Sequence, residues 1–186
     1  MESLNITRKE VEAKLVGVGD YVKMDFLQRC LKKNLDFDTK RFVMIKLVQV
    51  YEIRSMFLEA GKIARNVADI NTTFEGKYND FAKSMDLFVK GGDYNEAEVS
   101  FKKALACSSE KNKLVLKNRL KEILKARAKE LIAKDKRKNA MDAYEKLSEL
   151  PFLDSLERKE VQTALSHLYQ KLGKIREFGN LQRVMN

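Results

Sequence analysis

The feature that most constrains this chain is a turn-and-helix unit that recurs along it. Its clearest copy starts with the turn Gly91–Asp93 and continues in a helix carrying Tyr94, Ala97, Phe101 and Ala104. Glycines commonly end a helix, and small and aromatic residues at three- and four-residue spacing favour packing against a neighbouring helix. This stretch therefore predicts two antiparallel helices joined by a tight turn.

The unit returns at nearly regular intervals. The positions equivalent to Ala97 are Met24, Ala60, Ala97, Ala140 and Phe178, which lie 36, 37, 43 and 38 residues apart. A period in this range is typical of stacked helix pairs. One pair cannot bury its own apolar face, so neighbouring pairs must stack to form a continuous core.

The rest of the sequence also predicts helices and no strands. One proline and eight glycines in 186 residues are too few for an all-β protein. Capping boxes are expected at Thr7 with Glu10 and at Thr72 with Glu75. The long helical pattern from residue 40 to about 70 is expected to break near Arg54. We predict one all-α domain over residues 1–186, with about ten helices.

The strongest unit resembles the tetratricopeptide repeat family, and the following one resembles it more loosely. The matching residues are Phe81, Phe88, Gly92, Tyr94, Ala97, Phe101 and Ala104 in the first, and Leu124, Ala128, Leu131, Ala140, Tyr144 and Pro151 in the second. The chain departs from the family at Phe178 and Met85, where the family has small residues, and its intervals exceed the family's 34 residues.

The resemblance implies a right-handed superhelical stack of about five antiparallel helix pairs. Members of this family typically hold peptides or partner helices on a concave surface and are rarely enzymes. It therefore implies a non-catalytic scaffold with a protein partner. The first helices of the pairs would line that surface with residues such as Arg41, Gln49, Lys83, Asn118 and His167.

The sharpest compositional feature is a basic segment over residues 111–138. It contains 12 lysines and arginines against 3 acidic residues, which gives +9 of the chain's net charge of +10. Such a segment could bind a phosphate backbone or an acidic protein, or it could be a solvated lysine face. The candidate residues for an acidic partner or a polyanion are Lys113, Lys117, Lys121, Lys125, Lys129, Lys136, Arg137 and Lys138. The alternative function is therefore an RNA- or ribosome-associated factor.

The C-terminal helix is a second candidate surface. Repeat arrays normally end in a polar capping helix, but here the last helix carries Phe178, Leu181 and Met185 on one side. These residues could pack on the preceding helix, or they could be covered by a partner or by a second copy in a homodimer.

Residues typical of catalysis, metal binding or cofactor binding are sparse. The chain has one histidine, His167, and two widely separated cysteines, Cys30 and Cys107, which we expect at small buried helix positions. No phosphate-binding loop or paired Cys-x-x-Cys is present. We expect no enzyme activity, no metal and no cofactor. The polar N-terminal residues do not resemble a signal peptide, and no apolar run is long enough to cross a membrane, so we expect a cytoplasmic protein.

Overall fold

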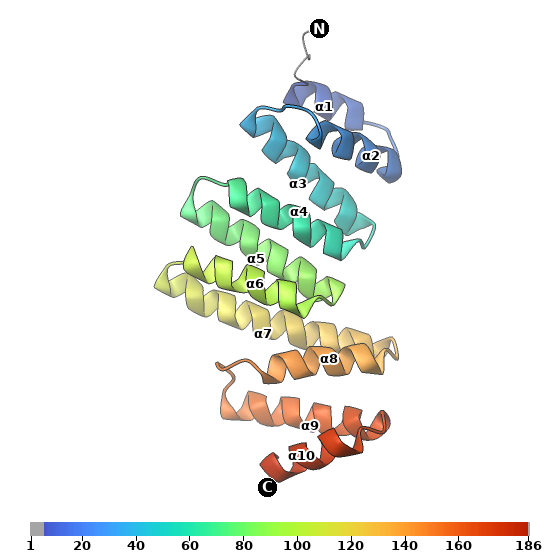
Figure 1. Ribbon diagram of the computed structural model, residues 1–186, viewed down its shortest axis with the longest axis vertical. Helices are drawn as coiled ribbons and strands as arrows, with labels where there is room; N and C mark the ends of the chain where they lie inside the picture. Colours follow the sequence, from blue (N-terminus) through green and yellow to red (C-terminus); the bar gives the residue numbers. More distant parts are fainter. Residues whose placement is uncertain (1–5, 186) are drawn as a thin grey trace. The chain divides into compact units, whose positions relative to one another are not determined.

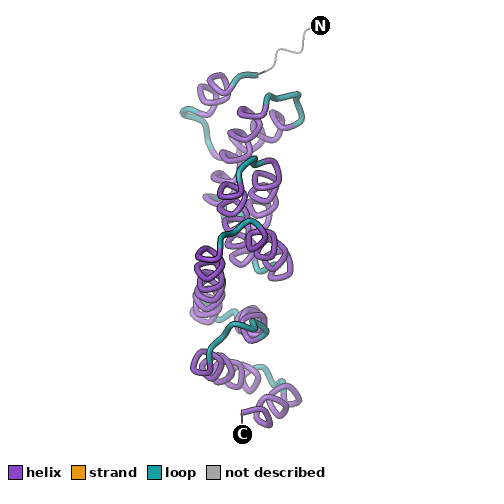
Figure 2. Tube along the Cα trace, turned by 90° about the vertical axis from the view of Figure 1, so that its left-hand side faces the viewer, coloured by secondary structure: helices purple, strands orange, loops and turns teal. Residues whose placement is uncertain are grey.

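The computed structural model describes residues 6–185, and these residues form helices and connecting turns only (Figures 1 and 2). The ten helices of this described part are α1 Arg8–Leu15, α2 Asp20–Leu31, α3 Phe37–Ile53, α4 Phe57–Ile70, α5 Phe74–Gly91, α6 Tyr94–Ala106, α7 Glu110–Ala133, α8 Arg137–Ser148, α9 Ser155–Lys171 and α10 Ile175–Met185. The all-α prediction is confirmed.

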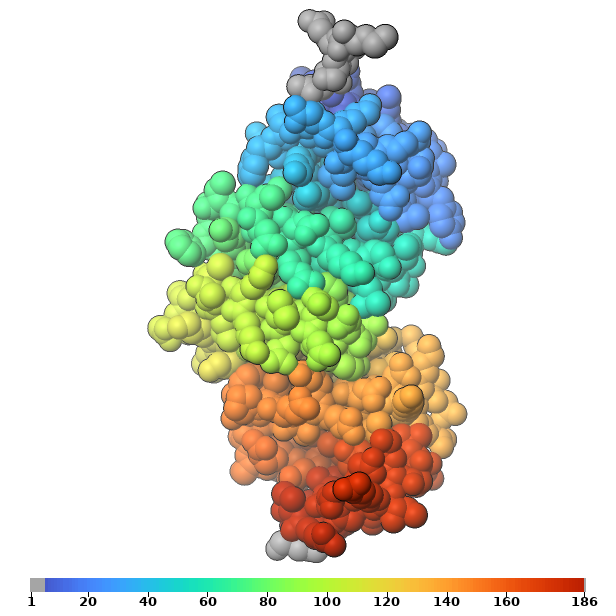
Figure 3. Space-filling model, viewed as in Figure 1, coloured from blue at the N-terminus to red at the C-terminus, as the bar shows by residue number. Residues whose placement is uncertain are grey.

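The helices fall into two compact units, residues 1–109 with α1–α6 and residues 110–186 with α7–α10. Consecutive helices pack side by side from α2 to α6 in the first unit and from α7 to α10 in the second, and within each unit the order in space follows the chain (Figure 3). The single-domain assignment over residues 1–186 stays a prediction.

Four helix pairs are joined by the same turn, a Schellman motif. In each, one residue has a positive φ: Ser55 (56°), Gly92 (85°), Asp135 (52°) and Gly173 (68°). The following amide donates a hydrogen bond to a carbonyl five residues earlier, at 2.8–3.0 Å: Met56 to Tyr51, Asp93 to Phe88, Lys136 to Leu131 and Lys174 to Tyr169. This motif satisfies carbonyls that the end of a helix would otherwise leave without partners.

The turns repeat with the same spacing as the small residues. The four residues with positive φ are 37, 43 and 38 positions apart. Each lies five positions before a repeat position of the second helix, and three of those, Ala60, Ala97 and Ala140, are at most 2% exposed. The small side chain therefore lies where the second helix meets its neighbours.

The first pair departs from this pattern. The described connection between α1 and α2 lacks the five-residue hydrogen bond, although Gly17 has a φ of 71°. Helix α1 packs mainly against α3 rather than against α2. Met24, the repeat position of α2, is only half-buried. Gly17 also lies seven positions before Met24, not five as in the other turns, so the first pair departs from the repeat in both spacing and packing.

The helix boundaries confirm some of the predicted caps and correct one. Thr7 and Glu10 form the predicted capping box, and α3 ends at Ile53, next to the predicted break. The predicted box at Thr72 is wrong, because the cap is Thr73, whose hydroxyl accepts a hydrogen bond from the Gly76 amide at 3.0 Å. Threonines at both positions made the register ambiguous in the sequence.

The core of the first unit includes a buried polar link between three helices. The hydroxyl of Ser84 on α5 donates to the Gly61 carbonyl of α4 at 2.9 Å, and it lies 3.1 Å from the Ser100 hydroxyl of α6. The Phe88 ring packs so closely on α4 that a Cβ at Gly61 would lie 3.1 Å from it. These contacts hold α4, α5 and α6 in one register.

The shared turn predicts opposite effects for two glycine-to-alanine changes in the second unit. A methyl group added at Gly173 or at Gly179 would meet no atom within 4 Å, and only Gly173 has a positive φ. Gly173→Ala should lower the free energy of unfolding by about 1–2 kcal/mol, whereas Gly179→Ala should raise it by about 0.5–1 kcal/mol. Urea titrations followed by circular dichroism measure both, and effects of equal sign would contradict the turn geometry.

Candidate binding groove

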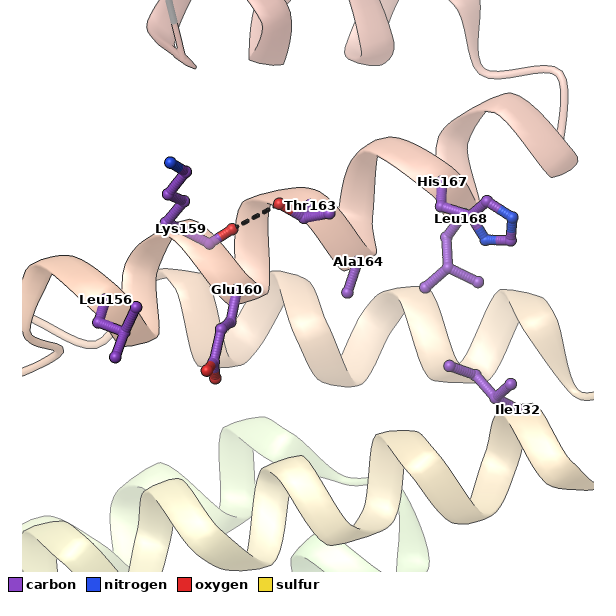
Figure 4. A pocket seen from close by; sticks show the side chains of 8 residues that line it. All are labelled: Ile132, Leu156, Lys159, Glu160, Thr163, Ala164, His167 and Leu168. Carbon is purple, nitrogen blue, oxygen red and sulfur yellow. Dashed lines mark hydrogen bonds between the residues drawn. The ribbon is translucent and has the colours of Figure 1, made fainter.

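The second unit contains a groove of about 620 Å³ between α7 and α9. Figure 4 shows its lining, with Ile132 contributed by α7 and the remaining residues by α9. The apolar members are Ile132, Leu156, Ala164 and Leu168, and the polar members are Lys159, Glu160, Thr163 and His167.

The groove exists because α9 uses only part of its surface for the core. One side of α9, which carries Val161, Leu165 and Tyr169, is buried. On the groove side, Leu156 at one end remains 68% exposed, and Ile132 of α7 at the other end remains 44% exposed (Figure 4). Exposed aliphatic side chains gathered in a concavity gain free energy when a partner removes them from water.

Two lysines of α7 reach across to one carboxylate of α9. Lys121 Nζ lies 2.9 Å from both carboxylate oxygens of Glu157, and Lys125 Nζ lies 3.4 Å from one of them. The three side chains are only 13%, 20% and 16% exposed, in the order Lys121, Lys125 and Glu157. This ion pair connects α7 to the first turn of α9, beside the groove.

Glu157 is fixed by the start of its own helix. Its carboxylate accepts a hydrogen bond from the Asp154 amide at 3.1 Å, and its own amide donates to the Asp154 carboxylate at 2.8 Å, which completes a capping box. The hydrogen bond from Lys121 is the largest of the effects that hold the pKa of Glu157 below its ordinary value. The carboxylate is therefore charged and in place at neutral pH.

The predicted basic residues separate into two groups. Four of them, all on α7, are engaged within the unit: Lys113 pairs with Glu110 at 2.5 Å, Lys117 lies 5.7 Å from the centre of the Phe152 ring, and Lys121 and Lys125 pair with Glu157. The other four are exposed: Lys129 on α7, Lys136 in the turn, and Arg137 and Lys138 at the start of α8, of which Arg137 pairs with Asp135 at 2.9 Å. The basic segment over residues 111–138 is therefore not a continuous surface of solvent-exposed positive charge.

The first unit contains a comparable but smaller groove between α3 and α5. It has a volume of about 240 Å³ and a floor formed by Ala64 and Val67 of α4. Ion pairs span it, because Lys83 lies 2.6 Å from Glu52, and Arg41 lies 3.4 Å from Asp80, which lines the groove. Of the expected surface residues, Gln49 and Lys83 line this groove, His167 lines the larger one, and Asn118 is exposed elsewhere on α7.

The predicted C-terminal surface is partly used within the unit. Phe178, Leu181 and Met185 are half-buried on α10, which packs against α9 and is joined to it by a 3.0 Å hydrogen bond from Gln182 to Ser166. Ile175 and Val184 of the same helix are largely exposed. A homodimer through this helix stays a prediction.

The other singled-out residues have ordinary environments. Cys30 is buried, which raises the pKa of its thiol, and Cys107 is half-buried. His167 is exposed. Within residues 6–185, no group of three or more His, Cys, Asp or Glu side chains could hold a metal ion. In the same part of the chain, no helix is both long and apolar enough to cross a membrane.

The sequence did not reveal the groove. Leu156 and Ile132 belong to different helices, and their exposure depends on how α7 and α9 are rotated. No protein-family model matches the chain, and neither does any curated protein sequence.

The ion pair between α7 and α9 predicts a pH-dependent contribution to stability. Glu157→Gln should lower the free energy of unfolding at pH 7 by about 1–2 kcal/mol, between the values for exposed ion pairs and for hydrogen bonds to charged groups. The pKa of Glu157 is lower in the folded state than in the unfolded state. The ion pair therefore contributes fully to stability at pH values above the unfolded-state pKa of about 4.3, and this stability is lost as the pH falls through the folded-state pKa.

Denaturant titrations of the wild type and the variant at pH 7 and pH 3 measure this difference. The control is Glu149→Gln, because the Glu149 side chain is 64% exposed in its pair with Lys146, so its loss should cost less than about 1 kcal/mol. Equal losses for the two variants at pH 7 would contradict the structural role of Glu157.

Proposed function

We propose that this protein is a non-catalytic interaction scaffold that binds a protein partner through the groove between α7 and α9. The observation that carries the proposal is a cleft of about 620 Å³ with Leu156 and Ile132 exposed at its walls. Concave apolar surfaces bordered by polar groups commonly mark binding sites. The proposal includes the right-handed stack of helix pairs of tetratricopeptide-repeat type and a cytoplasmic location.

The chemistry of the groove supports binding rather than catalysis. Its only hydroxyl belongs to Thr163 and donates to the Lys159 carbonyl of its own helix at 2.9 Å. Nucleophilic catalysis requires a nucleophile held by a base within hydrogen-bonding reach. The Thr163 hydroxyl is instead committed to the backbone, an arrangement common for threonine inside helices.

The second candidate function is binding to RNA or to a ribonucleoprotein surface. The second unit contains 19 lysines and arginines against 11 acidic residues, a net charge of +8, which supports this candidate. Its exposed lysines Lys129, Lys136 and Lys138 lie near the end of α7, in the turn to α8 and at the start of α8. Such a cluster could contact phosphates, and binding would then weaken steeply with salt.

Affinity purification from the native organism, with and without nuclease, separates the two candidates. For the scaffold, we expect the same proteins to be recovered in both cases. Recovery that disappears with nuclease would favour the RNA candidate and overturn the scaffold.

Charge reversal gives the matching test with purified protein. If RNA binds through the exposed cluster, changing Lys129, Lys136 and Lys138 to glutamate should lower the affinity for a structured RNA at least about tenfold, since each contributes to a salt-dependent term. The control changes Lys33, Lys40 and Lys62, three exposed lysines of the first unit, so that net charge falls equally. For the scaffold, we expect weak RNA binding that both triple variants reduce alike.

A further inference from the structure

We propose that the groove between α7 and α9 recognises an acidic segment of a partner protein that carries a bulky aliphatic or aromatic side chain. This inference rests on the proposed scaffold function and specifies the chemistry of the partner. The two parts of such a segment match two features of the groove, its apolar lining and the unequal charge on its two sides.

The aliphatic residues that line the groove favour a partner with an apolar side chain. Ile132, Leu156, Ala164 and Leu168 supply aliphatic surface from both helices, and the volume lies within the range of about 300–1,000 Å³ typical of ligand pockets. The small side chain of Ala164 leaves room in the middle of the α9 wall (Figure 4). Bulky apolar side chains placed on either side of Ala164 would remove Leu156 at one end of the groove and Ile132 at the other from water.

The positive charge of the α7 lysines favours a partner segment with acidic side chains. Lys121 and Lys125 share the single carboxylate of Glu157, so this trio carries a net charge of +1 with little exposure to water. Attraction to an added carboxylate is stronger at such a site than between fully hydrated charges. Lys129, one turn further along α7, is exposed, and so is Lys159 on α9. The surroundings therefore favour a negatively charged segment.

The carboxylate of Glu160 disfavours acidic side chains next to it and so predicts how the bound segment is oriented. Glu160 lines the groove from α9 and would repel acidic side chains placed against it. Acidic residues of the partner should therefore lie toward Lys125 and Lys129 on α7, with the apolar side chain toward α9. A basic segment would meet one carboxylate, Glu160, and one lysine, Lys159, in the lining, and it would be repelled by the lysines of α7.

Nucleic acid fits this groove less well than a peptide does. Single-stranded nucleic acids bind where bases stack on aromatic rings or on arginine. The lining contains four aliphatic side chains and one imidazole, with no phenylalanine, tyrosine or arginine. An aliphatic groove instead favours the side chains of a protein.

Selection from a displayed library of random 16-residue peptides on the full chain tests the inference. We expect enriched peptides to be rich in Asp and Glu around one or two bulky apolar residues. Ala164→Phe should weaken the selected peptides at least about tenfold, the effect expected at the centre of a binding site. The matched control is Ala126→Phe, which adds the same side chain at an exposed position of α7 outside the groove lining.

A second pair of variants tests the charge. Lys129→Gln should weaken the selected peptides about two- to fivefold, the range of an exposed charge pair. Lys111→Gln, an exposed lysine five turns earlier on α7, should leave affinity unchanged. If Ala164→Phe unfolds the protein, the Leu156→Glu variant is used in its place. The Leu156 side chain is 68% exposed, so the fold should tolerate this substitution.

Three outcomes overturn the inference: no enrichment, enrichment without an acidic bias, or equal binding by the Ala164→Phe and Ala126→Phe variants. Capture of native proteins by the wild type and by Ala164→Phe tests whether the proposed scaffold function must be rejected as well. If the wild type and Ala164→Phe capture the same native proteins, the scaffold stands and the groove is not its binding site. If the wild type captures no protein, both proposals fail.

Discussion

The structure depends on one repeated constraint, the turn that reverses the chain between the two helices of a pair. Backbone hydrogen bonds across five residues fix this turn at Ser55, Gly92, Asp135 and Gly173. Two of the four are not glycine, although a positive φ is unfavourable for other residues. Recurrence of the same geometry with such different residues indicates that packing of the paired helices, and not local preference alone, maintains the turn.

Once the turn is fixed, the packing of the second helix follows. Ala60, Ala97 and Ala140 each lie five residues after a turn and are buried. Small residues there let the second helix approach its neighbours closely, and longer side chains on the first helices fill the core. Where packing is incomplete, as between α7 and α9, an apolar groove remains. The candidate binding surface is thus a consequence of how the pairs stack.

Much of the fold could be predicted from the sequence, because it depends on local periodicity. The spacing of Ala60, Ala97 and Ala140 located the helix pairs, and the break near Arg54 located a turn. The candidate site could not be predicted in the same way. The row of lysines on α7 is visible in the sequence, but its pairing with Glu157, 36 residues beyond Lys121, depends on the rotation of two helices. The exposure of Leu156 depends on the same rotation.

Amide hydrogen exchange measured by nuclear magnetic resonance tests the repeated turn most directly. The amides of Met56, Asp93, Lys136 and Lys174 lie in turns between helices, where exchange would be fast without a hydrogen bond. The structure gives each an acceptor within 3.0 Å, so all four should exchange much more slowly than the nearby amides that lack an acceptor. Fast exchange at these four positions would show that the turns differ from the one described, and the repeated pair would not hold.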